Sequence, residues 1–213
     1  MNKGFMFDST LRDGAQGENV NFSVEDKLNV LKALDDFGID FIEAGIPASN
    51  PKDIEFFRRA EDYPLKNAKL VAFGSTRRKN TSCFADTNLN ALANTKTEYV
   101  SVFGKSWDMH ATDIIGCTLE ENLAMISDTI RYLTEKGKKV IFDAEHFFDG
   151  FKANRKYALY TIKAAGNLPA AFIHSVSGEH LLQLFILGFQ TPPLQTGQAG
   201  QTHIQNGLGL LLA

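Results

Sequence analysis

The sequence has 213 residues, of which 44% are hydrophobic and 22% charged, and its formal net charge is −3. This length and composition are typical of one globular domain with a sizeable core. With no basic block and no apolar run long enough to cross a bilayer, we expect neither nucleic acid nor membrane as a partner. Cys83 and Cys117 match no metal or redox spacing, which favours a reduced, cytoplasmic protein.

The first predicted element is a short strand at 4–7, and polar residues follow it closely. Arg12, Asp13 and Gln16 lie just beyond its C-terminal end. An arginine offers a rigid fork of donors, and an aspartate offers a hard oxygen ligand. In a barrel of parallel strands, active sites lie at this end. The pair therefore predicts a site for a divalent cation and an oxygen-rich substrate, although an Arg-Asp dipeptide alone is more often a surface ion pair.

The next element is predicted to be a helix. Ser23 is suited to its N-cap, with Asp26 three residues on as the capping partner. Gly38 is expected to end the helix. The predicted apolar stripe consists of Leu28, Leu31, Leu34 and Phe37.

Strands and helices then alternate along the chain. Further strands are predicted at 39–44, 69–73, 99–103 and 140–144, and helices at 51–63, 86–94, 119–136 and 154–165. Units of about thirty residues imply a parallel sheet with right-handed crossovers. We favour a (β/α)8 barrel, incomplete after about five units, over an open doubly wound sheet. No glycine-rich phosphate loop follows the first strand, as the doubly wound fold would favour.

Polar residues follow every predicted strand. Glu43 ends the second strand, His110 lies beyond the fourth, and Glu145 follows the fifth. Taken singly, Glu43 is more simply a hydrogen-bonded barrel residue and His110 a surface histidine. Together, these groups predict a polar, acid-rich pocket that binds a divalent cation and a carboxylate substrate.

Long motifs in residues 3–165 resemble one enzyme superfamily. The sequence is similar to the isopropylmalate, homocitrate and citramalate synthases and hydroxymethylglutaryl-CoA lyase, and looks closest to the bacterial citramalate synthases. The stretches that carry this resemblance are Asp8-Ser9-Thr10-Leu11-Arg12-Asp13-Gly14 with Gln16, Glu43-Ala44-Gly45, Ala72-Phe73-Gly74-Ser75-Thr76-Arg77-Arg78, Val102-Phe103-Gly104-Lys105-Ser106-Trp107, and Asp143-Ala144-Glu145-His146-Phe147-Phe148-Asp149-Gly150.

The resemblance implies a (β/α)8 barrel that condenses acetyl-CoA with pyruvate, a 2-oxo acid, and releases citramalate and CoA on a route to isoleucine. By position, Asp13 matches the aspartate that binds a divalent cation (Mg, Mn or Zn). Arg12 matches the arginine that holds negative charge on the reacting oxygens, and Glu145 a glutamate of the acid–base steps. Residues expected to position substrate are Gln16, Glu43 and His110. A homodimer is implied for intact members.

Residues 166–213 differ from the rest of the chain. They contain a single charged side chain, Glu179, and no His-X-His pair of the kind that completes the metal site in the resembled superfamily. We therefore divide the chain into 1–165, the N-terminal part of a catalytic barrel, and 166–213, a segment that is either out of frame or divergent. Three interpretations stay open: a synthase, a related acyl-CoA lyase, and a non-catalytic remnant.

Overall fold

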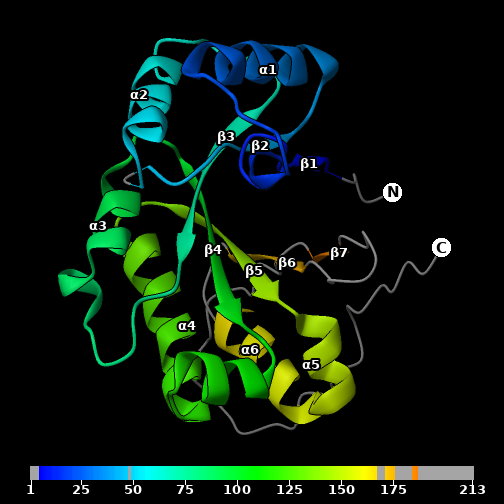
Figure 1. The fold of residues 1–213 in the computed structure, drawn as a ribbon. Coiled ribbons are helices and arrows are strands. Elements are labelled where there is room, and N and C mark those ends of the chain that lie inside the picture. The colour runs from blue at the N-terminus through cyan, green and yellow to red at the C-terminus, as the bar shows by residue number, and fades with distance from the viewer. Residues whose placement is uncertain (1–4, 48, 167–170, 176–183, 187–213) are drawn as a thin grey trace, which may run out of the picture.

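A computed structural model describes residues 5–47, 49–166, 171–175 and 184–186. Their strands form one sheet in the order β1 to β7 (Figure 1). The strands β1 to β6 are parallel, and β7 runs antiparallel to β6. The strand bounds are β1 Phe7–Asp8, β2 Phe41–Glu43, β3 Lys69–Ser75, β4 Tyr99–Lys105, β5 Lys139–Glu145, β6 Ala171–Ser175 and β7 Leu184–Ile186.

Helices connect the parallel strands and follow them around the outside of the curved sheet (Figure 1). Among the described residues, no helix is long and apolar enough to cross a membrane. The helix bounds are α1 Val24–Phe37, α2 Pro51–Ala60, α3 Thr87–Asn94, α4 Leu119–Glu135, α5 Phe147–Ala153 and α6 Arg155–Gly166, with shorter helical segments at Gly14–Gln16, Cys83–Ala85 and His110–Ile115.

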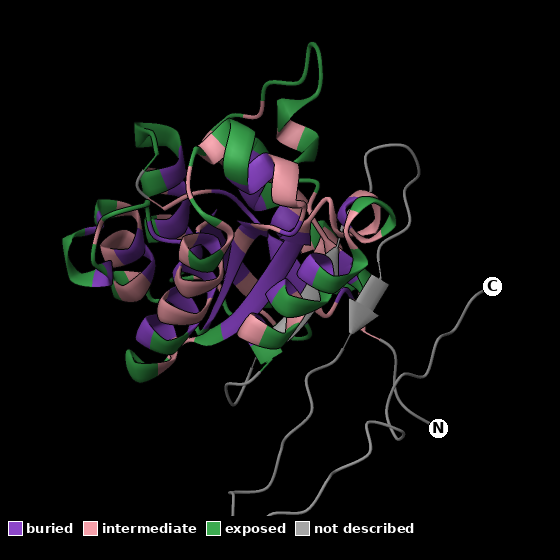
Figure 2. Ribbon diagram, turned by 90° about the horizontal axis from the view of Figure 1, so that it is seen from below, coloured by how far each residue is buried: buried purple, intermediate pink, exposed green. Residues whose placement is uncertain are grey.

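The two faces of the sheet pack differently. The outer face carries residues such as Ile42, Val100 and Phe142, which join the helices in the main core. The inner face has a separate apolar cluster made by strand residues with Phe5, namely Phe7, Phe41, Val71, Tyr99 and Ile141. Figure 2 shows the buried strands beneath helices whose outward sides are exposed. Within the described part of the chain, the helices between the strands pack on one face of the sheet. This arrangement confirms the incomplete (β/α)8 barrel over the doubly wound alternative.

The start and end of α1 form as local chemistry predicts. The Ser23 hydroxyl accepts a hydrogen bond from the Asp26 N–H at 3.1 Å, and the Asp26 carboxylate accepts one from the Ser23 N–H at 2.8 Å. Gly38 follows the helix with φ of 92°, a left-handed conformation that suits glycine.

The predicted apolar stripe of α1 is wrong at Phe37, whose side chain is exposed. A step of three residues falls short of a full helical turn by about 60°. The series Leu28, Leu31, Leu34 and Phe37 therefore drifts around the helix until Phe37 lies opposite Leu28. Asp35, seven residues after Leu28, returns to the buried face.

Strand ends differ from their predicted positions. β3, β4 and β5 continue one or two residues beyond the predicted ends, because the parallel ladder still pairs Ser75 with Phe103 and Lys105 with Glu145. The helices at 110–115 and 147–153 and the strands β6 and β7 were not predicted. The strands β6 and β7 lie in the charge-poor segment 166–213, most of which (167–170, 176–183 and 187–213) falls outside the described residues.

Asp35 ties α1 to the chain before β3 and makes stability depend on pH. Its carboxylate accepts hydrogen bonds from the backbone N–H groups of Lys66, Asn67 and Ala68 at 2.7–2.9 Å. Burial by itself raises the pKa of Asp35, but these donors together lower the pKa below its ordinary 3.8.

A carboxyl group with a lowered pKa stabilises the fold above its unfolded pKa and loses that contribution as pH falls. We therefore expect the free energy of unfolding in urea to decrease as pH falls below about 4. The Asp35→Asn variant should lose part of that dependence. An identical pH dependence in the variant, measured from pH 7 to 3, would contradict this assignment.

Candidate functional site at the C-terminal ends of the strands

The inner face becomes polar toward the C-terminal ends of the strands. Because alternate residues of a strand share a face, the apolar cluster around Phe41 and Tyr99 is followed along the same face by other residues. These are Glu43 on β2, Ser101 and Lys105 on β4, and Asp143 and Glu145 on β5. The alternation of side chains along each strand thus places charged groups on the same face as the apolar cluster, nearer to the C-terminal ends of the strands.

Arg12 lies between three partners at this end of the sheet. Its Nε donates to Glu43 Oε2 at 2.6 Å and its Nη1 to Asp13 Oδ1 at 2.9 Å. The guanidinium carbon lies 4.0 Å from the centre of the Phe73 ring. The chain reaches this position through a tight turn, in which the Ser9 carbonyl accepts hydrogen bonds from consecutive N–H groups. The Arg12 guanidinium is therefore held in one orientation.

Glu43 is almost completely buried. Burial raises the pKa of Glu43 and the neighbouring Asp143 carboxylate adds to this rise, whereas the Arg12 cation opposes it. A buried carboxylate needs such a partner, since its charge is costly away from water. In this structure, Glu43 contacts Arg12 and so orients it.

Asp13 and Gln16 lie on the exposed side of this turn. The Asp13 side chain is 59% exposed and contacts Arg12. Gln16 lines a cavity of about 300 Å³ together with Arg12, next to Lys27 and Asp53. The structure therefore brings Arg12, Asp13 and Glu43 into contact and leaves Gln16 at the edge of the group.

Sequence analysis missed Lys27 and Asp53, which form a buried ion pair beneath that cavity. Lys27 Nζ donates to Asp53 Oδ1 at 2.6 Å and to the Ala44 carbonyl at 2.8 Å. The pair thereby connects α1 to α2 and to the residue that follows Glu43. A sequence signal existed, because Lys27 directly precedes Leu28 on the apolar side of a predicted helix.

Glu145 and His110 lie together at the ends of β4 and β5. Glu145 forms an ion pair with Lys105, its partner in the ladder. His110 is buried rather than exposed as a surface histidine, and its ring lies 4.9 Å from Trp107 and 4.6 Å from His146, measured between ring centres. Burial lowers the pKa of His110, and electrostatic interaction with the neighbouring His146 and Lys105 lowers it further.

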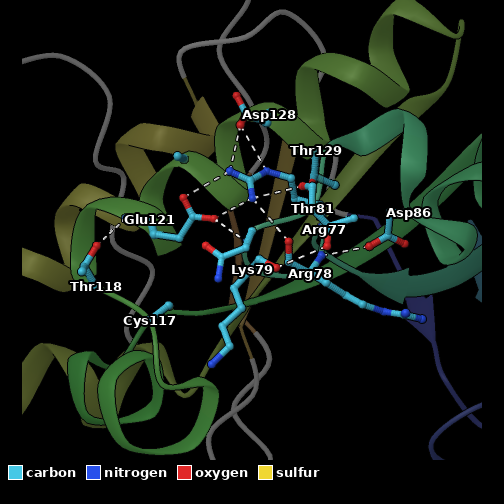
Figure 3. Close-up of polar contacts among 12 residues, drawn as sticks. Arg77, Arg78, Lys79, Thr81, Asp86, Cys117, Thr118, Glu121, Asp128 and Thr129 are labelled. Atoms are coloured by element: carbon cyan, nitrogen blue, oxygen red, sulfur yellow. Dashed lines mark hydrogen bonds and ion pairs between the residues drawn. The ribbon is translucent and has the colours of Figure 1, made fainter.

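Arg77 holds the segment that follows β3. Its guanidinium donates to Glu121 Oε1 at 2.7 Å and to Asp128 Oδ2 at 3.0 Å, both on α4. Figure 3 shows Arg77 pointing between these carboxylates, whereas Arg78 and Lys79 point elsewhere. This segment and the end of β4 line a cavity of about 480 Å³.

A divalent cation fits these residues only in part. Asp13 can offer one carboxylate oxygen, but its Oδ1 already accepts from Arg12. Within the described part of the chain, no three His, Cys, Asp or Glu side chains come together as a metal site. A hard cation takes several oxygen ligands. The described residues therefore do not form a complete metal site, and we derive no step through one.

Comparison with known proteins identifies the family to which this chain is similar. The model of the HMGL-like family matches residues 5–175. The chain is 53% identical over 163 residues to an (R)-citramalate synthase of Aquifex aeolicus and 48% identical over 169 residues to one of Synechocystis. These matches cover 76% and 79% of the chain. The chain spans only 31% of the length of these curated relatives.

Solved structures agree on the fold. A hydroxymethylglutaryl-CoA lyase from Pseudomonas aeruginosa aligns with 80% of this chain and 67% of its own, at a TM-score of 0.53 and 14% identity. Identity this low shows a shared fold and no more. The residues matched by the family model run from before β1 to the end of β6, so they include the strand ends that carry Arg12, Glu43 and Glu145. The chain belongs to the HMGL-like family.

Proposed function

We propose that the chain carries the N-terminal part of a citramalate synthase-type acyltransferase for isoleucine biosynthesis. Such an enzyme condenses acetyl-CoA with pyruvate, and water then hydrolyses the thioester to give citramalate and CoA. One observation supports this most directly: the guanidinium of Arg12, oriented by Glu43 and Phe73 at the polar end of the sheet. The (R)-citramalate synthase relatives support the choice of substrates.

Arg12 and Glu145 would have different roles: Arg12 would stabilise negative charge and Glu145 would exchange a proton. The enolate of acetyl-CoA attacks the ketone carbon of pyruvate, and negative charge develops on the ketone oxygen. A positioned guanidinium stabilises that charge more in the transition state than in the substrate. Glu145, paired with Lys105, would exchange a proton with the reacting groups. Substrate would be positioned by Gln16, Glu43 and His110. Glu43 would also position Arg12.

The proposal includes further features of the intact enzyme. A divalent cation would be bound in part by Asp13 and would polarise the oxygens of the 2-oxo acid. The remaining ligands would come from outside the described residues. We further propose a cytoplasmic, homodimeric enzyme. The free thiols Cys83 and Cys117 support a reducing compartment.

We also propose the division of the chain into residues 1–165, a part of the catalytic barrel, and residues 166–213, a segment that is out of frame or divergent. The abrupt loss of charge after residue 165 supports this division. Resequencing the coding DNA across codons 160 to 213 tests it. A His-X-His pair in another frame would favour the first explanation, and its absence from every frame would favour a divergent segment.

Release of the CoA thiol tests the proposed function. The protein is incubated with acetyl-CoA and Mg²⁺, Mn²⁺ or Zn²⁺, with and without pyruvate, and the thiol is measured with a chromogenic disulfide. We expect release that requires pyruvate and stops when the cation is chelated. Thiol and a ketone product from an acyl-CoA alone would indicate a lyase instead. Absence of release under every condition would contradict the proposal and favour a non-catalytic protein.

A further inference from the structure

We propose that His110 and His146 form a coupled imidazole pair that carries no more than one positive charge near neutral pH and so sets the charge beside Glu145 at the C-terminal ends of the strands. The two rings come from different elements. His110 opens the helix at His110–Ile115, after β4, and His146 directly precedes α5, after β5. Their ring centres are 4.6 Å apart with the ring planes at 76°.

At this separation, two imidazolium cations would repel each other, which disfavours a positive charge on both rings at the same time. His110 is the member less able to carry charge, because it is 92% buried and its Nδ1 has no hydrogen-bond partner among the described residues. A proton on that nitrogen would be a buried donor without an acceptor. By contrast, His146 Nδ1 lies 3.5 Å from Asp149 Oδ2, so a proton on His146 is paired.

The backbone places the two rings together at some cost. His146 has φ of 55°, in the left-handed region that side chains other than glycine rarely adopt. Gly150 brings α5 against the segment of Trp107, since a Cβ at Gly150 would lie 2.8 Å from the Trp107 Cα. Such local strain is characteristic of functional positions.

Charged groups from each neighbouring element face the pair. Lys105 on β4 and Glu145 on β5 already neutralise each other, and Asp149 on α5 faces His146. The pair is therefore the group at this place best able to gain or lose one unit of charge around neutral pH. The link to catalysis rests on the proposed function, because acetyl-CoA, pyruvate and water yield citramalate, CoA and one proton, which the pair could accept beside Glu145.

Nitrogen-15 NMR of the histidine rings tests the coupling without any substrate. The labelled full chain is titrated from pH 5 to 8, and His110→Gln and His146→Asn assign the signals. Asparagine is chosen at position 146 because it tolerates the left-handed backbone. We expect the His110 midpoint below its ordinary 6.5 in the original protein and a shift upward in His146→Asn. The matched control Asp113→Asn, on the helix that His110 opens, should leave the midpoint in place.

An amide spectrum of each variant first establishes that the fold is kept. A His110 midpoint at or above 6.5 in the original protein overturns the pair, and so does an unchanged midpoint in His146→Asn. A failure of thiol release would leave this titration unaffected, because no substrate is present. Equally, a titration in which the two histidines behave independently would not affect the proposed condensation, which thiol release tests separately.

Discussion

Replacing Arg12 with glutamine should slow pyruvate-dependent thiol release by about 100- to 1000-fold. The Arg12 guanidinium follows β1 and is held in place by two hydrogen bonds. It donates to Glu43 at 2.6 Å and to Asp13 at 2.9 Å. Glutamine removes the charge that would stabilise the developing alkoxide. It also leaves the buried Glu43 carboxylate without its cation, so the pKa of Glu43 should rise further above its ordinary value.

Two further variants separate these effects. Arg12→Lys keeps a positive charge, but a single ammonium cannot reproduce the fork between Glu43 and Asp13. We expect its rate to lie between those of the original protein and Arg12→Gln. Arg58→Gln, at an exposed arginine on α2, is the control and should change little. A normal rate for Arg12→Gln, in a variant with normal thermal unfolding, would show that Arg12 has no part in the reaction.

Replacing Arg77 with methionine should lower the free energy of unfolding by about 2 kcal/mol. The guanidinium is buried and is shared between Glu121 and Asp128 on α4. The backbone N–H of Arg77, which the variant keeps, donates to the Thr129 hydroxyl at 2.8 Å. Losing one partner of a buried ion pair typically costs more, about 3–5 kcal/mol. The smaller figure reflects the two carboxylates, which are 29% and 37% exposed and can be hydrated in the variant.

A second arginine near Asp128 provides the control for Arg77→Met. Arg131 also approaches Asp128, at 3.5 Å, but its side chain is 55% exposed. Arg131→Met should therefore change the free energy of unfolding by less than about 0.5 kcal/mol. Urea unfolding followed by circular dichroism measures both variants. Equal losses for Arg77→Met and Arg131→Met would mean that burial of the Arg77 guanidinium adds nothing.

The alternation of strands and helices was predictable because it depends on local patterns. Strands covered on both faces read as short apolar runs, and helix ends carry their own signals. Ser23 with Asp26, Gly38, and Pro51 at the start of α2 all lie where these signals place them. The strand ends that carry Arg12, Glu43 and Glu145 follow from the same alternation, since parallel strands present their C-terminal ends at one edge.

The partner of each charged side chain was decided only by the tertiary structure. Arg12 and Glu43 are 31 residues apart, Lys27 and Asp53 are 26 apart, and Arg77 reaches Asp128 across 51. These contacts depend on strand register and on which helix covers which strand, and neither leaves a periodic mark in the sequence. His146 lies against His110 because two loops converge. The sequence by itself therefore determined the repeating units and the rim they share, whereas side-chain packing between distant units determined the contacts within that rim.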